Sequence, residues 1–225
     1  MSFLASLDWR RAVKHFSPPT HAAPAPDIKP LLDAAIAAPT CFGLQPFKIV
    51  VVEAAEAKAH LAPVCYNQPQ ITEATHLLIF CARNDLETRL EEYVAATHTP
   101  PEGRAVIEGM LSHLSHPTHW AKHQAYIALG FALAAAAEKR ISSCPMEGFN
   151  PEGVSAALDL PHTLTPAVIL AVGVTDTRPE ATPYERFRFP ESDLVLRQTE
   201  SSPVAAPRSR YRNSTPVRKR KGKTE

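Results

Sequence analysis

The chain has 225 residues, 44% of them hydrophobic, and a formal net charge of +1. This is enough for one sizeable domain or two small ones with an ample apolar core. The near-neutral total hides an uneven distribution, because the residues from Pro207 onward carry eight basic residues and one acid. The preceding residues carry 16 basic and 22 acidic side chains. A strongly basic character therefore cannot be assigned to the fold itself.

The four cysteines lie far apart and form no C-x-x-C pair, which favours a reducing compartment over a disulfide scaffold or a zinc site; they are Cys41, Cys65, Cys81 and Cys144. The longest apolar run, Ala125–Ala137, is shorter than the roughly 20 residues that a membrane-spanning helix needs. No secretory signal precedes Asp8. We therefore expect a cytoplasmic protein without a membrane span.

Hydrophobic periodicity and turn residues predict many helices and few strands. We expect helices at 1–16, 27–38, 56–64, 84–96, 105–113, 120–140 and 148–158. Buried strands are predicted at 47–53, 76–82 and 167–174, with a short last strand at 193–196 and a turn at 145–149. This pattern predicts an α+β fold with a small mixed or antiparallel sheet covered by helices.

The predicted helix Trp120–Arg140 is apolar on every face between Ala125 and Ala137. Such a helix is typically buried on all sides, so we expect it to be the central element of the fold. Residues 1–200 would form one domain, and residues 201–225, rich in Ser, Pro, Arg and Lys, a disordered basic tail.

The tail leaves a non-enzymatic alternative open. Pro216–Lys221 resembles a nuclear-localisation or nucleic-acid-binding patch, although a solvated tail is the simpler interpretation. The body offers no basic stripe, so a nucleic-acid partner would explain the tail alone.

Several common motifs are missing, including the G-x-G-x-x-G turn, the P-loop and the G-x-S-x-G elbow. A row of histidines has helical spacing and could ligate a metal: His113, His116, His119 and His123. Pro117 interrupts the row, and no carboxylate or cysteine is interleaved, so we expect no metal site.

Two basic clusters could converge on one phosphate, because arginine binds phosphate through planar, bidentate contacts. The first cluster contains Arg10, Arg11 and Lys14, and the second contains Arg186 and Arg188. Composition alone also allows both to be solvated surface charges.

Five segments, in order and in register, resemble the nitroreductase family of flavoenzymes. They are Arg10–Phe16, Ala35–Val50 with its Gln-Pro-aromatic ending, Asn67–Phe80, Trp120–Leu133 with Pro145–Phe149, and Arg186–Pro190. The likeness covers roughly residues 8–200. The resemblance implies a homodimer that binds FMN at its interface.

The resemblance also implies roles for particular residues. Arg10, Arg11, Arg186 and Arg188 would hold the FMN phosphate, and Lys14 would lie near the pyrimidine edge. Asn67 would contact the flavin ring, and Glu147 and Gly148 would offer it their backbone N–H groups. The other subunit would supply a second group of residues, Pro39, Thr40, Cys41 and Gly43. The predicted set is completed by Gln124 of the central helix and by Pro145 and Met146 of the turn.

Three positions depart from the family pattern. Ala12 replaces a usual Ser, Gln70 replaces a Lys of close bacterial members, and Gly43 replaces a commonly polar residue. The resemblance implies ping-pong hydride transfer from NADH or NADPH to a nitroaromatic, a quinone or a related small acceptor. An enoate or pteridine reductase with the same fold is the alternative.

Overall fold

The computed structural model describes residues 2–175 and 186–198, in two units, Met1–Pro183 and Tyr184–Glu225, which are treated separately. The larger unit contains a four-stranded sheet in the order β1-β2-β4-β3, with every pairing antiparallel. Its strands are β1 (Phe47–Val52), β2 (His76–Arg83), β3 (Ser142–Met146) and β4 (Leu164–Gly173). The predicted α+β fold with a small sheet is confirmed, and the sheet is antiparallel.

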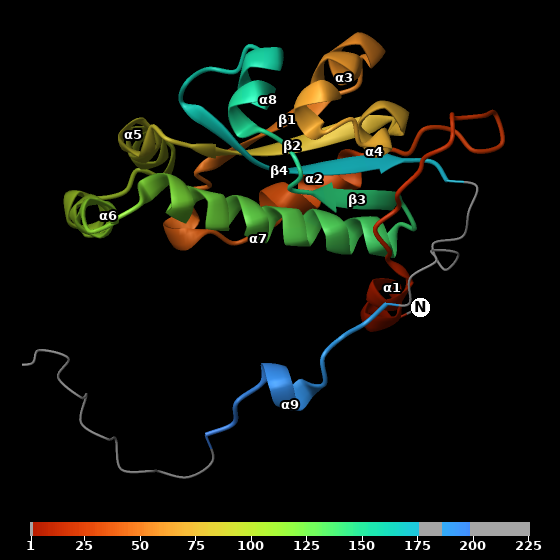
Figure 1. Ribbon diagram of the computed structural model, residues 1–225. Coiled ribbons are helices and arrows are strands. Elements are labelled where there is room, and N and C mark those ends of the chain that lie inside the picture. Colours follow the sequence, from red (N-terminus) through yellow and green to blue (C-terminus); the bar gives the residue numbers. More distant parts are fainter. Residues whose placement is uncertain (1, 176–185, 199–225) are drawn as a thin grey trace, which may run out of the picture. The chain divides into compact units, whose positions relative to one another are not determined.

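The central strands are buried on both faces because both carry long apolar runs. In β2, Leu77 and Ile79 point to one side of the sheet, and Leu78 and Phe80 point to the other. All four side chains are fully buried. The sheet is therefore the middle layer between two helical layers (Figure 1).

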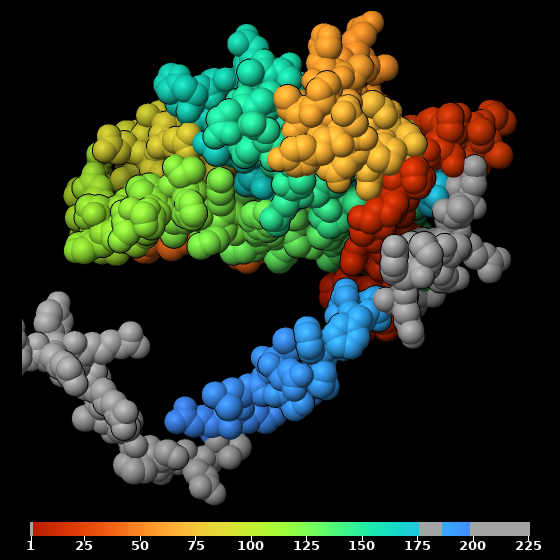
Figure 2. All heavy atoms as spheres, in the orientation of Figure 1, coloured from red at the N-terminus to blue at the C-terminus, as the bar shows by residue number. Residues whose placement is uncertain are grey.

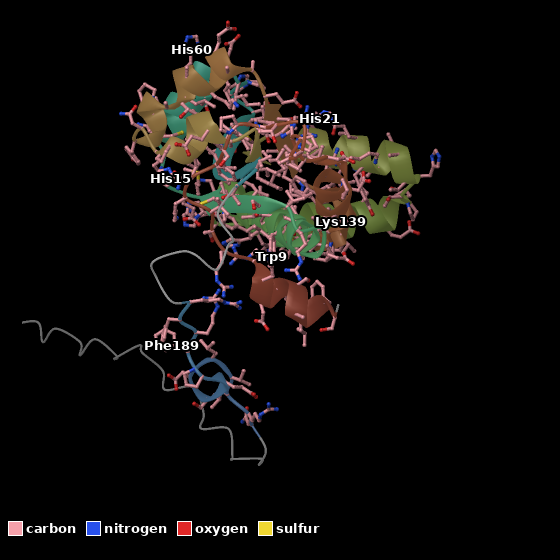
Figure 3. All side chains as sticks on the ribbon, turned by 90° about the vertical axis from the view of Figure 1, so that its right-hand side faces the viewer. Trp9, His15, His21, His60, Lys139 and Phe189 are labelled. Atoms are coloured by element: carbon pink, nitrogen blue, oxygen red, sulfur yellow. The ribbon has the colours of Figure 1, made fainter. Side chains whose placement is uncertain are left out.

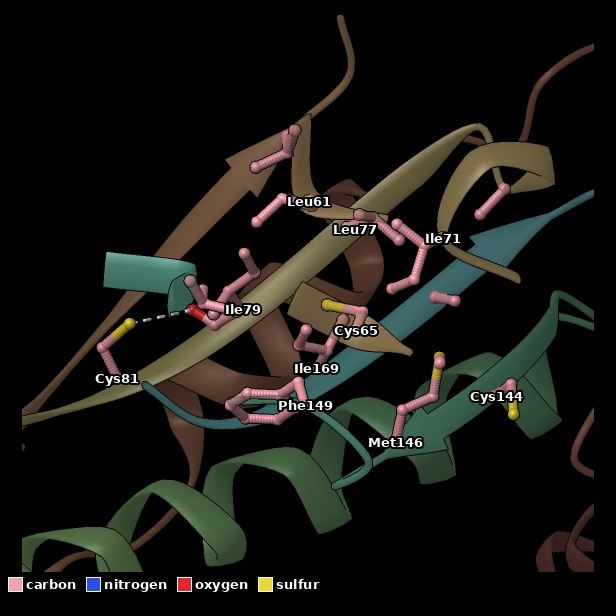
Figure 4. Packing of buried hydrophobic residues seen from close by; sticks show 14 of the residues in the cluster. Leu61, Cys65, Ile71, Leu77, Ile79, Cys81, Cys144, Met146, Phe149 and Ile169 are labelled. Atoms are coloured by element: carbon pink, nitrogen blue, oxygen red, sulfur yellow. Dashed lines mark hydrogen bonds between the residues drawn. The ribbon is translucent and has the colours of Figure 1, made fainter. Parts of the chain in front are cut away.

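One helical layer consists of short elements: α3 (Ala55–Leu61), η2 (Pro63–Cys65), α4 (Pro69–Glu73) and α8 (Pro151–Ala157). Leu61, Cys65 and Ile71 from this layer pack with Leu77 and Ile79 of β2 (Figure 4). Pro69 is the first residue of α4, where a missing N–H costs nothing, and the sequence analysis predicted no helix there.

The other layer consists of α2 (Lys29–Ala37) and α7 (Pro117–Glu138). Alanines of α7 lie against Phe80 and Leu170 of the sheet and against Leu31 of α2. Pro117 begins α7 rather than interrupting it. No helix among residues 2–175 and 186–198 is long and apolar enough to cross a membrane.

The expectation that the central helix is buried on all sides is wrong for the single chain. Ile127, Gly130 and Phe131 lie on the side of α7 that faces away from the sheet, and all three are exposed. In Figure 2, α7 forms a continuous flank of the larger unit. The sheet and α2 cover only part of the helix, because they approach it from one side.

Beyond the amino end of α7, α5 (Leu86–Thr97) and α6 (Pro101–Ser112) form a helical hairpin. Leu44, which follows the short helix η1 (Cys41–Gly43), packs into a cluster with Leu90 and Ile107 of the hairpin. Arg89 Nε donates to the carbonyl of Leu44 at 2.6 Å. The hairpin thus fixes the loop that precedes β1.

The amino terminus differs from the prediction of a helix over 1–16. Helix α1 covers only Phe3–Trp9, and the following residues are extended, with Ser17 N–H donating to the carbonyl of Val174 at 2.8 Å. The apolar side chains are divided accordingly, because Phe3 is exposed whereas Phe16 is buried. The Arg140 guanidinium lies 4.8 Å from the ring centre of Trp9 and ties α1 to the end of α7, near Lys139 (Figure 3).

Two further elements were assigned wrongly from sequence. Residues 142–146 form strand β3, so the first two residues of the predicted turn 145–149 belong to a strand, and Pro145 is tolerated because β3 lies at the edge of the four-stranded sheet. In the smaller unit, 191–194 form helix α9 (Glu191–Leu194) where a strand was expected. Pro190 before the helix and two acids in its first turn favour a helix start.

Replacing Phe80 by Ala should lower the free energy of unfolding by about 3–5 kcal/mol, because it leaves a cavity between β2 and the α7 layer. Urea denaturation measures the change. Val106→Ala, at an exposed position on α6, is the control and should change stability by about 0.5 kcal/mol or less. Equal effects of the two substitutions would contradict the assigned core.

Candidate functional site

The predicted basic segment lies along the open edge of β3. Val13 N–H donates to the carbonyl of Ser143 at 3.1 Å, and Ala12 forms a parallel bridge with Ser143. An edge strand offers unpaired backbone groups, and the segment uses them. Residues 10, 12 and 14 of an extended chain share one side, so Arg10 and Lys14 lie on the same side of the segment.

Lys14 is brought next to the buried thiol of Cys144, with 3.8 Å between Nζ and Sγ. Burial raises the pKa of Cys144, whereas the charges of Lys14 and Arg10 and hydrogen bonds from Gln70 and Lys14 act to lower it. Four residues from three segments, Arg10, Lys14, Gln70 and Cys144, therefore lie close together at the β3 edge of the sheet. Three of the four, Arg10, Lys14 and Gln70, are predicted site residues.

Two buried oxygen atoms at this edge of the sheet, on opposite faces of it, have no hydrogen-bond partner among the residues that the structure describes. They are Oε1 of Gln70 and Oγ of Ser143, whose residues are 5% and 1% exposed. An unsatisfied buried polar group costs about 1–3 kcal/mol, so such atoms normally have a partner. The cluster therefore has the character of a polar binding site.

The turn after β3 carries Glu147 and Gly148. Gln68 Nε2 donates to the carbonyl of Gly148 at 2.6 Å, and Phe149 N–H donates to the carbonyl of Glu147 at 2.9 Å. Burial raises the pKa of the Tyr126 phenol, and its hydrogen bond with the Glu147 carboxylate raises it further. The Glu147 side chain is thus directed to α7. Pro145 and Met146 belong to the strand rather than to the turn.

A second group of predicted residues is anchored elsewhere in the larger unit. Gln124, near the start of α7, accepts a hydrogen bond at its Oε1 from the N–H of Cys41, 3.0 Å away. Thr40 Oγ1 accepts from Gln45 N–H at 3.0 Å. Gly43 has a φ of 73°, a conformation that glycine adopts without strain. In this chain Gln124 therefore supports the loop Pro39–Gly43.

The remaining predicted residues are placed as follows. Asn67 is exposed and adopts a left-handed conformation with a φ of 51° beside Gln68. Arg186 and Arg188 belong to the smaller unit, in which Arg188 donates to the carbonyl of Phe187 at 2.7 Å. Their convergence with Arg10 and Arg11 stays a prediction.

Sequence reasoning missed Ser143, Cys144, Gln68 and Glu73 as neighbours of the site. The first two lie in a strand that has no recognisable periodicity. Gln68 lies between the predicted residues Asn67 and Gln70, and Glu73 lies three residues after Gln70. This proximity is the only sequence signal that could have indicated them.

Comparisons with known proteins identify the family and the fold. The sequence model of the nitroreductase family matches residues 7–174. A Thermus thermophilus protein named NADH dehydrogenase is 32% identical over 178 residues, which cover 75% of this chain and 83% of that protein. A Staphylococcus haemolyticus protein that bears the name of an NAD(P)H nitroreductase is 27% identical over 216 residues, covering 86% and 96% of the two chains.

A solved structure of a nitroreductase-type protein from Exiguobacterium sibiricum, in complex with FMN, superposes with a TM-score of 0.71. Its sequence identity is 18%, and the match covers 88% of this chain and 98% of that one. Together the matches confirm the family and the fold that the motifs predicted.

The thiols should differ sharply in reactivity. Burial raises the pKa of Cys65 to about 11 and that of Cys81 to about 12, and it also raises the pKa of Cys144. A raised pKa lowers the thiolate fraction, so these thiols stay protonated at pH 8. Iodoacetamide should therefore modify partly exposed Cys41 first, as followed by peptide mass spectrometry. Early modification of Cys144 would contradict the described burial.

Proposed function

The chain belongs to the nitroreductase family, and on that premise we propose that it is an FMN-dependent oxidoreductase that passes hydride from NADH or NADPH to small acceptors. Nitroaromatics, quinones and related compounds are the proposed acceptors. The observation that carries the proposal is the cluster under the edge of β3. There Lys14 and Gln70 both lie against the thiol of Cys144, and the side-chain Oε1 of Gln70 is buried without a partner among the described residues.

The cluster fits the pyrimidine edge of a flavin, which alternates N–H donors with carbonyl acceptors. The free oxygen of Gln70 can accept a hydrogen bond from a flavin N–H, and the ammonium group of Lys14 can donate one to a flavin carbonyl. The ammonium group of Lys14 favours the negative charge of a reduced flavin.

The phosphate is assigned to the guanidinium groups of Arg10 and Arg11, together with those of Arg186 and Arg188. Planar, bidentate donors suit a phosphate better than a point charge does. In the described structure, Arg11 donates to the backbone carbonyls of Asp8 and Arg10. These bonds hold the Arg11 guanidinium beside the extended segment that carries Lys14.

Bound FMN supplies the hydride chemistry, in a ping-pong sequence in which NAD(P)H leaves before the acceptor enters the same pocket. The residues of the chain bind and orient. The turn residues Glu147 and Gly148 offer backbone N–H groups to the ring, and Lys14 stabilises developing negative charge. Solvent can supply protons, so no side chain is assigned as an acid or base.

The protein is proposed to work as a homodimer in which Pro39–Gly43 complete the partner's site. Support comes from the exposed apolar side of α7, where Ile127 and Phe131 remain uncovered within the chain. Phe3 and Leu4 of α1, which packs against α7, are exposed as well. Contiguous exposed apolar side chains mark association surfaces, and obligate dimers bury core-like ones.

Purified protein should be yellow, with flavin absorption bands, and should oxidise NADH or NADPH when a quinone is added. Lys14→Ala should keep FMN but slow this oxidation about tenfold, because a lost contact of about 1.4 kcal/mol in the transition state lowers the rate by that factor. Lys29→Ala, which removes an exposed lysine paired with Asp33, is the matched control. A colourless protein that neither binds added FMN nor supports the reaction would refute the proposal.

Replacing Phe131 by Glu should convert the dimer to a monomer and release FMN at the same time, because a buried unpaired charge at the interface is costly. Size-exclusion chromatography with absorbance at the flavin bands measures both. Val106→Glu, at another exposed apolar position, should stay dimeric and yellow. A stable, yellow Phe131→Glu monomer would rule out the shared site.

A further inference from the structure

Glu73, the last residue of α4, holds the segment that carries Lys14. Its Oε2 accepts a hydrogen bond from the N–H of Phe16 at 2.9 Å, and its Oε1 lies 3.4 Å from Nδ1 of His15. His15 itself points outward from the segment (Figure 3). Lys14 is therefore fixed on both sides in the chain, by the bond of Val13 to β3 before it and by the bond of Phe16 to Glu73 after it.

Gln68, just before α4, holds the turn that carries Gly148. Its Nε2 donates to the carbonyl of Gly148 at 2.6 Å and to the carbonyl of Cys65 at 3.1 Å. The amide thus joins the turn to the end of η2. The N–H of Asn150 donates to the carbonyl of Val64 at 2.8 Å, which is a second bond between the same two segments.

Residues 68–73 are themselves held in place by packing and hydrogen bonds. Pro69 begins α4, the Ile71 side chain is fully buried in the core, and Ala74 closes the helix. Lys58 Nζ donates to the carbonyl of Ala74 at 2.5 Å and ties the end of α4 to α3. A short element that is anchored in this way can fix the distance between the two segments that Gln68 and Glu73 contact.

We propose that residues 68–73 act as a bracket that sets the spacing between the basic segment and the turn after β3, with Glu73 and Gln68 as positioning residues for FMN. The inference rests on the proposed function for the identity of the ligand. Neither side chain is assigned a contact with FMN. Glu73 acts through the backbone of Phe16, and Gln68 acts through the carbonyl of Gly148.

The two side chains have opposite hydrogen-bonding roles. Exchanging the acid for the amide at one position, and the amide for the acid at the other, therefore tests the proposal. Glu73 serves as an acceptor, so Glu73→Gln keeps an oxygen for Phe16 N–H. Gln68 serves as a donor, so Gln68→Glu has no N–H for Gly148. Glu73→Gln should resemble the wild type, whereas Gln68→Glu should behave like Gln68→Ala. Thr72→Ala, at an exposed position in the same helix, is the control.

Hydrogen exchange of the ligand-free protein, read by NMR or mass spectrometry, gives a measurement that does not depend on FMN. Glu73→Ala should speed exchange within residues 13–17, and Gln68→Ala should speed it within residues 147–150. Exchange in the β2 core should stay slow in every variant, which shows that the variants are folded. Unchanged exchange in both segments would overturn the bracket, even if the wild type is yellow.

FMN titration supplies the second measurement. Glu73→Ala and Gln68→Ala should each raise the Kd about tenfold, which corresponds to about 1.4 kcal/mol. The double variant should raise the Kd by far less than about a hundredfold, because either substitution alone already leaves the distance between the basic segment and the turn unfixed. Fully additive effects, or equal loss in Glu73→Gln and Glu73→Ala, would overturn the inference. A wild type that does not bind FMN would instead refute the proposed function and leave the exchange result standing.

Discussion

The pairing of the N-terminal segment with the edge of β3 is the contact on which the candidate site depends. In an extended chain, successive side chains alternate between two sides. Val13 therefore enters the core, while Arg10 and Lys14 come to the same side, where both charges act on Cys144. A helix would also have placed Arg10 and Lys14 on one face, but it could not have paired with the edge of β3 and brought both charges to Cys144. Backbone pairing with the edge of the sheet thus determines which charged side chains lie close together.

The central helix α7 has a comparable dual role. Its alanines allow β2, β4 and α2 to approach closely on one side, and its larger apolar residues, Ile127 and Phe131, lie on the other. A sequence that is apolar all round predicts burial, but it does not distinguish burial within the chain from burial against a second copy. The described residues cover one side only. The exposed side is the physical basis for the proposed dimer.

Much of the fold follows from local sequence signals, and the exceptions have identifiable causes. Strands β1, β2 and β4 are continuous apolar runs, and their predicted ranges lie close to the observed ones. Strand β3, Ser142–Met146, shows no such run and contains Pro145, so only its pairing with β4 makes it a strand. The roles of Gln68 and Glu73 arise from hydrogen bonds to distant segments. No periodicity encodes such contacts, whereas the likeness of whole motifs indicated Lys14 and Gln70.

The predicted site residues occur in two groups with separate supports. Lys14 and Gln70 depend on β3 and α4, whereas the loop Pro39–Gly43 depends on Gln124 and on the α5–α6 hairpin, through the contacts of Leu44. In the proposed twofold dimer, each site takes one group from each subunit, so both sites are completed together. The hairpin lies between Phe80 and Trp120, outside the five segments that carry the resemblance. Because it supports only the second group, we propose that changes in it alter acceptor preference without moving Lys14 and Gln70.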